Sequence, residues 1–103
     1  AALAELFDPH RHEQAYSEVP VQYLDGDQLV YGIIDRLVLQ PGRVQVIDYK
    51  THRSASADTI PALVGQYRNQ MRLYAEAAAR LWPGREVRAF LLFTACETLA
   101  EAG

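Results

Sequence analysis

The stretch Val46-Ile47-Asp48-Tyr49-Lys50-Thr51, preceded in the chain by Gly32-Ile33-Ile34-Asp35, decides the fold. It places two carboxylates and a lysine at the ends of apolar segments, where charge is costly unless it is paired or binds a metal ion. Residues 28–39 and 43–50 each predict a β-strand, because they are apolar runs separated by the turn signal Pro41-Gly42.

The length of that turn decides whether the two carboxylates can meet. With an even turn, Gln40 pairs with Arg43, and Asp35 then lies directly opposite Asp48 at roughly 4.5–5.5 Å between Cβ atoms. Two like charges at that separation repel each other unless a divalent cation lies between them. An odd turn would send the two aspartates to opposite faces of the sheet. Side chains alternate along a strand, so Asp48 shares a face with Lys50.

The rest of the chain predicts three further elements. Alternating apolar residues over 18–24 predict a first strand, joined to the second by the turn signal Asp25-Gly26-Asp27. Apolar residues at helical spacing predict a helix from about 60 to 82, with Asp58 or Thr59 at its N-cap. Residues 86–94 predict a last, largely buried strand. The order β-β-β-α-β predicts an α/β fold: an antiparallel three-strand meander, a crossover helix and a strand parallel to the third.

The composition indicates one small domain. The chain has 103 residues, of which 50% are hydrophobic, enough for a single core. It contains no apolar stretch of the roughly 18 residues that a membrane span needs, and its N-terminus lacks a signal pattern. The lone Cys96 cannot form an internal disulfide, so we expect a cytoplasmic protein. The net charge of −3 argues against DNA binding by this domain alone.

The motifs resemble those of the PD-(D/E)XK nuclease superfamily, and most closely the RecB/AddA-type exonuclease domain at the C-terminal end of bacterial helicase-nucleases. That family reads G-x-x-D, then a hydrophobic pair with D-Y-K-T, then a helix with Y-x-x-Q-x-x-x-Y. Here these are Gly32 to Asp35, Val46 to Thr51, and Tyr67, Gln70 and Tyr74. The resemblance covers about residues 18–95 and implies a restriction-endonuclease-like core. Residues 1–17 would be a weakly structured lead-in, and 1–103 a single partial nuclease domain.

The resemblance also implies the site. Asp35 and Asp48 would bind Mg²⁺ or Mn²⁺ together with the backbone carbonyl of Tyr49, since these hard cations prefer oxygen ligands. Lys50 would orient the attacking water and stabilise the charge that builds up on the phosphate. Gln70 would reach this site from the helix.

Other residues receive supporting roles or none. Glu18, Thr51 and Tyr74 would support the site, whereas Tyr67 fits the apolar stripe of the helix better than a site. RecB-type sites take a further metal ligand from a histidine on an upstream helix. None of the three histidines matches that position: His10, His12 and His52. We therefore expect this helix to be missing from the chain.

The predicted function is that of a metal-dependent DNA exonuclease domain, part of an ATP-dependent helicase-nuclease in recombinational DNA repair. Its partners would be DNA and the helicase domains, with no membrane, and self-association would cover apolar surface left by absent elements. The alternative is a non-catalytic nuclease-like module that binds DNA or a helicase partner. The acidic charge and the missing histidine favour this alternative, while the intact Asp35, Asp48 and Lys50 disfavour it. A structural domain with a coincidental D-Y-K-T would require that Asp35 and Asp48 face apart.

Overall fold

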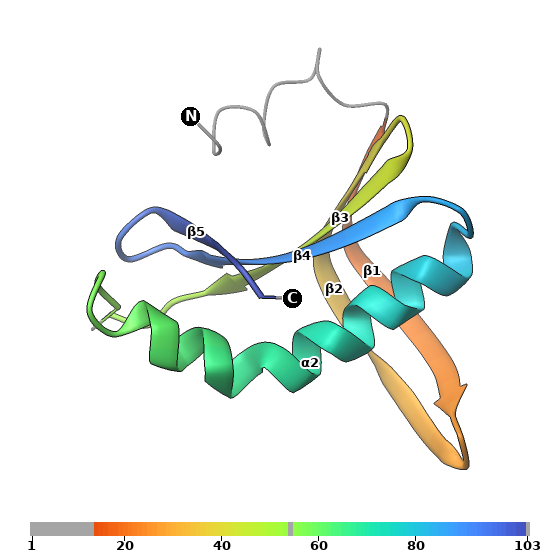
Figure 1. Cartoon of the computed structure of the whole chain (residues 1–103), viewed down its shortest axis with the longest axis horizontal. Helices are drawn as coiled ribbons and strands as arrows, with labels where there is room; N and C mark the ends of the chain where they lie inside the picture. Colours follow the sequence, from red (N-terminus) through yellow and green to blue (C-terminus); the bar gives the residue numbers. More distant parts are fainter. Residues whose placement is uncertain (1–13, 54, 103) are drawn as a thin grey trace.

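The computed structural model describes residues 14–53 and 55–102, in which one helix crosses one face of a mixed β-sheet (Figure 1). In chain order the elements are β1 (Gln14–Asp25), β2 (Gln28–Gln40), β3 (Arg43–Lys50), α2 (Ile60–Leu81), β4 (Glu86–Phe93) and β5 (Thr98–Glu101). The strands lie side by side in chain order, and only β3 and β4 are parallel. The helix α2 makes the crossover that this parallel pair requires. Within the described residues, no helix is long and apolar enough to cross a membrane.

The α/β class predicted from the sequence is confirmed, with differences at the ends of the chain. The strand β1 begins at Gln14, four residues before the predicted start at Glu18. The prediction missed β5, which pairs antiparallel with β4 through Phe90 to Phe93. A four-residue strand is too short for its periodicity to be distinguished from that of a loop. Thr59 occupies the N-cap of α2, but its side chain makes no capping hydrogen bond to the helix and instead contacts Ser56.

Apolar side chains are buried on both faces of the sheet. The larger core lies between the sheet and α2, where Leu37, Val46 and Met71 are fully buried. A smaller cluster of Val38, Ile47 and Leu92, all of them strand residues, lies on the opposite face. The central strand β3 therefore alternates between two apolar environments, and this explains why its sequence is almost continuously apolar.

The turn between β2 and β3 has the even length that the site requires. Gln40 pairs with Arg43, and the ladder continues to the pair of Arg36 with Ile47. Gly42 has a φ of 72°, a left-handed conformation that glycine adopts without steric cost. Of the two registers that the sequence left open, the structure has the even one, in which the next position along the two strands brings Asp35 opposite Asp48.

Both β1 and β2 reverse their side-chain alternation close to this position. Tyr16 stacks on the tryptophan at the end of α2 at a centroid distance of 6.5 Å, yet Val19 also packs into the core on the α2 side. On β2, Ile34 and Leu37 both belong to that same core. Residues three apart on a regular strand would face opposite sides. Glu18, with a φ of 53°, lies within the reversal on β1.

A close approach explains one glycine of the G-x-x-D motif. A Cβ atom at Gly32 would lie 2.9 Å from both Cε1 and Oη of Tyr74, which is closer than real Cβ contacts. The ring of Tyr74 on α2 therefore packs directly over the backbone of β2. Gly32 of the G-x-x-D motif and Tyr74 of the helix motif therefore contact each other directly.

This contact predicts that Gly32→Ala is destabilising. The added methyl group must displace Tyr74, and overpacking of this kind costs about 1–3 kcal/mol in the free energy of unfolding. Chemical denaturation of the wild type, Gly32→Ala, Tyr74→Ala and the double variant measures the coupling. We expect the loss in unfolding free energy of the double variant to be smaller than the sum of the losses of the two single variants.

A matched control is Gly65→Ala on α2, where the new Cβ meets nothing within 4 Å. There alanine is expected to stabilise the chain by roughly 0.5–1 kcal/mol, because it favours the helix. Strict additivity between Gly32→Ala and Tyr74→Ala would contradict the proposed contact.

Candidate active site

The C-terminal end of β3 carries a buried charged pair beneath α2. Among the residues that the structure describes, Asp48 is the one charged residue that is fully buried, at 6% exposure. Its Oδ2 atom lies 2.6 Å from Nζ of Lys50, whose side chain is 15% exposed. Charges so far from water persist only with a partner, so each of these two groups depends on the other.

Three groups from two elements surround the Lys50 ammonium. Besides the contact with Asp48, Nζ donates a hydrogen bond to Oε1 of Gln70 at 3.2 Å and lies 4.0 Å from the ring centroid of Tyr67. The backbone of Lys50 is held as well, since its carbonyl accepts a hydrogen bond from the backbone N–H of Thr94 at 3.0 Å. The lysine is therefore fixed at its backbone from the end of β4 and at its tip by α2.

Asp35 reaches the same place from β2. Its Oδ2 atom accepts a hydrogen bond from the backbone N–H of Tyr49 at 2.8 Å. The ladder between β2 and β3 has ended by then, with the pair of Arg36 and Ile47. The carboxylate thus supplies an acceptor to β3 where the ladder pairing stops. This contact turns Asp35 toward the strand that carries Asp48.

The electrostatics of the pair are dominated by burial. Burial raises the pKa of Asp48 above its ordinary value, and contact with the Asp35 carboxyl raises it further. The hydrogen bond and charge of Lys50 act in the opposite direction but do not restore the ordinary pKa. Asp48 therefore bears a net desolvation cost when it carries its negative charge.

The donor set fits a hard divalent cation. Two carboxylates meet at one point, and Oδ2 of Asp48 is buried without an aligned hydrogen bond, the Lys50 ammonium being its ionic neighbour. Mg²⁺ is commonly held by one or two carboxylates and several waters. Within 14–53 and 55–102, no group of three or more histidine, cysteine, aspartate or glutamate side chains forms a metal-binding cluster. Asp35 and Asp48 are therefore the side chains that could hold such an ion.

The structure brings some of the predicted site residues together and leaves others apart. Asp35, Asp48, Lys50 and Gln70 meet at one point. Glu18 is exposed on β1 in a left-handed conformation, and Tyr74 packs on Gly32 rather than on the lysine. Thr51 is exposed and lines a hollow of about 220 Å³ together with Tyr49, Lys50, His52 and Tyr67.

Tyr67 packs against the larger core, as the apolar stripe of the helix predicts, and it also borders the site. Its ring contacts the Lys50 ammonium, and its hydroxyl lies 2.6 Å from Nε2 of His52. The sequence held a signal for this, because residues three apart lie on one helix face and Tyr67 precedes Gln70 by three. His10 and His12 lie outside the described residues.

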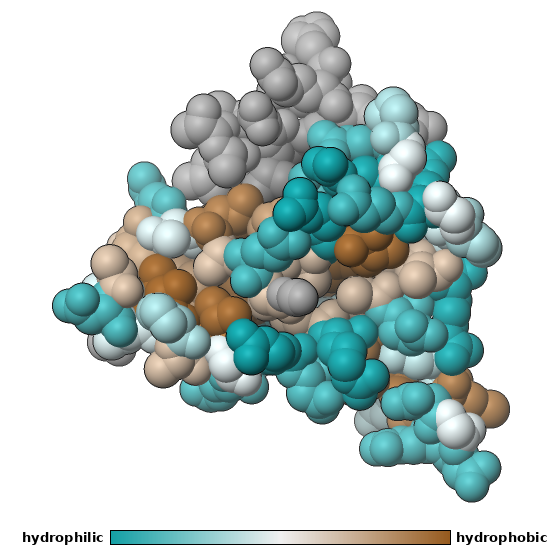
Figure 2. All heavy atoms as spheres, in the orientation of Figure 1, coloured by the Kyte–Doolittle hydropathy of each residue, from teal (hydrophilic) through white to brown (hydrophobic). Residues whose placement is uncertain are grey.

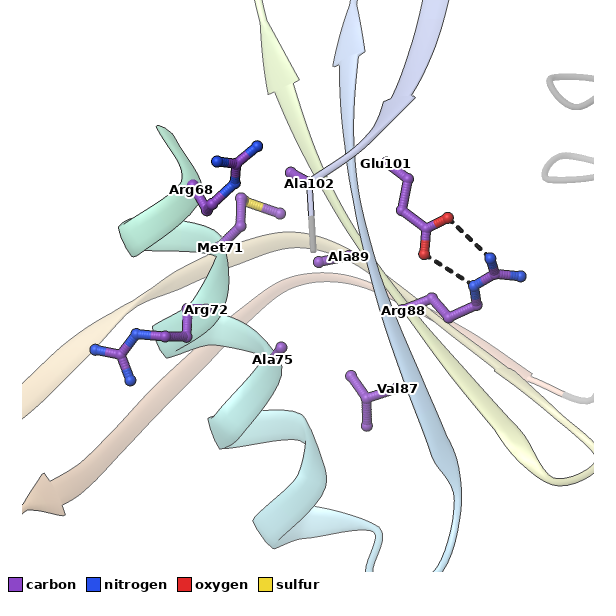
Figure 3. A pocket seen from close by; sticks show the side chains of 9 residues that line it. All are labelled: Arg68, Met71, Arg72, Ala75, Val87, Arg88, Ala89, Glu101 and Ala102. Carbon is purple, nitrogen blue, oxygen red and sulfur yellow. Dashed lines mark hydrogen bonds and ion pairs between the residues drawn. The ribbon is translucent and has the colours of Figure 1, made fainter. Parts of the chain in front are cut away.

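A larger hollow on the other flank of α2 contains none of the predicted site residues. Figure 2 shows a band of apolar residues between rows of hydrophilic residues, and Figure 3 shows the side chains around this hollow of about 390 Å³. It is lined by Arg68, Met71, Arg72, Ala75, Val87, Arg88, Ala89, Glu101 and Ala102. Its one carboxylate, Glu101, is engaged by Arg88 in two hydrogen bonds of 2.8 and 2.9 Å. Size alone therefore does not mark the active site.

The chain is similar to known proteins over most of its length. The family model of the PD-(D/E)XK nuclease superfamily matches residues 1–102. An ATP-dependent helicase/nuclease subunit from Streptococcus mutans is 31% identical over 93 residues, which cover 84% of this chain and 7% of that protein. The protein of the same name from Streptococcus equi subsp. zooepidemicus is 36% identical over 97 residues, which cover 87% of this chain and 8% of that protein.

One solved structure is also similar in outline. The crystal structure of protein VC1899 from Vibrio cholerae has a TM-score of 0.46 and 18% sequence identity, and it covers 87% of this chain and 21% of that chain. This chain thus spans only a small part of each of these three proteins.

The raised pKa of Asp48 predicts how stability changes with pH in the absence of divalent cations. A group whose pKa is raised by folding stabilises the folded state below its unfolded pKa, and this contribution is lost as the pH rises through the folded pKa. The unfolding free energy of the wild type should therefore fall relative to that of Asp48→Asn as the pH rises from acid to neutral. Denaturation curves of both proteins across this range, with a chelator present, measure the difference.

The exposed Asp58, which lies in the loop before α2, provides the control. The corresponding difference for Asp58→Asn should show no such fall. A wild type that gains stability over Asp48→Asn as the pH rises would mean that Lys50 lowers the pKa of Asp48 more than burial raises it.

Proposed function

We propose that this chain, which belongs to the PD-(D/E)XK nuclease superfamily, hydrolyses phosphodiester bonds of DNA with a divalent cation held by Asp35 and Asp48. The observation that carries the proposal is the meeting of these two carboxylates with the Lys50 ammonium at the end of β3. Opposed carboxylates repel each other, and a divalent cation turns that repulsion into coordination. The backbone carbonyl of Tyr49, between Asp48 and Lys50, is the third protein ligand that we propose.

A bound divalent cation would lower the pKa of a coordinated water and polarise a phosphoryl oxygen. The rest of the chemistry belongs to the chain itself. Lys50 places a fixed positive charge beside the carboxylates, where negative charge develops on the phosphate during attack. Gln70 accepts a hydrogen bond from this ammonium and keeps it oriented toward the site. Asp48 holds this ammonium in place through the contact of 2.6 Å between its Oδ2 atom and Nζ.

The relatives suggest the setting in which this reaction takes place. The curated relatives are named as subunits of ATP-dependent helicase/nucleases. We infer that this domain is the exonuclease part of such a cytoplasmic enzyme and acts in recombinational DNA repair, with Mg²⁺ or Mn²⁺ as its cofactor. ATP binding would belong to the helicase domains, which would also hold the DNA. This arrangement accounts for a nuclease domain with a net charge of −3.

The β1–β2 hairpin is the surface on which we infer contacts with those domains or with a second copy of the chain. The side chains of Leu24, Leu29, Tyr31 and Ile33 are 59, 49, 76 and 57% exposed. Apolar side chains grouped in this way are typical of a surface that another protein covers. Self-association through this hairpin stays a prediction.

A non-catalytic module that binds DNA or a helicase partner is the second candidate. It is favoured because, among residues 14–53 and 55–102, no third histidine, cysteine or acidic side chain joins Asp35 and Asp48 in a metal-binding group. The buried pairing of Asp48 with Lys50 disfavours it, because binding DNA gives no reason to bury a carboxylate. The two candidates differ in whether DNA is cut.

Digestion of linear DNA by this chain in the presence of Mg²⁺ or Mn²⁺ tests the proposal. We expect a cation-dependent release of nucleotides that falls by about 10²-fold or more in Lys50→Ala, since the loss of a group that stabilises transition-state charge has effects of this size. Asp48→Ala should abolish cutting in the same assay.

The control is Arg80→Ala, which also removes one positive charge from the chain. Arg80 lies near the end of α2, where it pairs with Glu76 at 3.2 Å, so cutting should continue unchanged. DNA binding without cutting, equal in the wild type and Lys50→Ala, would favour the non-catalytic module.

A further inference from the structure

Lys50 is the only lysine in the sequence, beside nine arginines, and its tip is held on three sides. Two of the contacts are polar, to Oδ2 of Asp48 at 2.6 Å and to Oε1 of Gln70 at 3.2 Å. The third is the ring of Tyr67, whose centroid lies 4.0 Å from Nζ. An ammonium over the face of an aromatic ring is attracted by the negative charge density of that face, most strongly where water is excluded.

The ring of Tyr67 is itself held in place from the loop that follows β3. Nε2 of His52 lies 2.6 Å from the Tyr67 hydroxyl, and the two rings are 5.7 Å apart at an interplanar angle of 54°. Because His52 follows Lys50 by two residues, the chain leaves β3, holds the tyrosine of α2 and thereby encloses the lysine. Lys50 on β3, His52 in the following loop and Tyr67 on α2 thus form a closed circuit of contacts, in which Tyr67 contacts both of the other two residues.

We propose that Tyr67 and His52 are positioning residues for Lys50, with the ring of Tyr67 as the wall against which the ammonium rests and His52 as the group that fixes that wall. This role rests on the proposed function, in which Lys50 is the reacting cation. A lysine side chain has four rotatable bonds and loses much entropy when it is held at one point. Contact with Asp48 and Gln70 alone leaves one side of the ammonium unrestrained.

The hollow beside the lysine shows why that side matters. Lys50, His52 and Tyr67 line the same space of about 220 Å³, which opens to solvent at the end of β3. Without the ring, the ammonium could swing into this space and away from the carboxylates. The ring holds the ammonium through its aromatic face, a contact that uses none of the carboxylate oxygens of Asp35 and Asp48.

The single lysine makes this circuit directly measurable, because lysine-selective ¹³C labelling yields one side-chain signal per nucleus. In the wild type, the Lys50 Hε protons should be shifted upfield by the ring current of Tyr67. Tyr67→Leu should move them to the position of a free lysine. Tyr67→Phe and His52→Ala both keep the aromatic ring but remove the contact between the Tyr67 hydroxyl and His52, so each should retain only part of the shift.

Tyr31→Leu is the matched control, since Tyr31 is 76% exposed on β2 and should leave the Lys50 signal unchanged. Backbone amide spectra check that each variant is folded. If Tyr67→Leu unfolds, the two separate variants Tyr67→Phe and His52→Gln serve as conservative replacements. A Lys50 signal without an upfield shift in the folded wild type, or one that is the same in folded Tyr67→Leu, would overturn the role of Tyr67. An unchanged signal in folded His52→Ala would overturn that of His52.

Rates of DNA cutting then separate positioning from simple support of the fold. We expect Tyr67→Leu to lower kcat about tenfold or more with little change in KM, because a misplaced catalytic group slows the chemical step. Tyr67→Phe, which keeps the ring without its contact to His52, should have a kcat between those of the wild type and Tyr67→Leu. A lost ring-current shift with unchanged kcat would overturn the positioning role. If the wild type cuts no DNA, the proposed function fails, while the NMR signal still decides whether the circuit holds Lys50.

Discussion

The even register between β2 and β3 is the constraint on which the site depends. It places Asp35 at the position opposite Asp48, at the point where the ladder ends and a side chain takes over from the backbone as hydrogen-bond acceptor. A shift by one residue would turn every side chain of β2 to the other face. Such a shift would bury polar groups and expose Leu37 and Leu39, so the core itself enforces the register. The same apolar packing that stabilises the sheet therefore brings two like charges together.

The charged pair at the end of β3 shows that this arrangement is costly for the fold. Burial makes the ionised form of Asp48 unfavourable, and Lys50 offsets only part of that cost. A buried ion pair is weak support for stability, since apolar residues of similar volume often do as well or better. Its position at the meeting point of β2, β3 and α2 is better explained by chemistry than by stability. Thr94, just after β4, and Gln70 on α2 fix the lysine, so separate parts of the fold contribute to the placement of one side chain.

Much of the fold could be predicted from the sequence, because strands and helices follow from the spacing of apolar residues and from turn residues. The strands around Pro41-Gly42 and the helix were predicted within a few residues of their ends. The sequence left an even and an odd turn open, and the structure has the even turn, in which Gln40 pairs with Arg43. The reversal at Glu18 could not be predicted, since a left-handed residue other than glycine leaves no mark in an alternating pattern. The contact of Tyr67 with Lys50 was missed because an aromatic residue on the apolar stripe of a helix can pack against the core and border the site together.

The central claim is that Asp35 and Asp48 hold one divalent cation between them, and paramagnetic Mn²⁺ tests it most directly. Amide signals recorded during addition of Mn²⁺ broaden according to their distance from the ion. We predict that the signals of Asp35, Asp48 and Tyr49 broaden first, and that Asp35→Asn combined with Asp48→Asn removes the effect. Broadening that begins elsewhere, for example around Glu101, or that persists in the double variant would contradict the account.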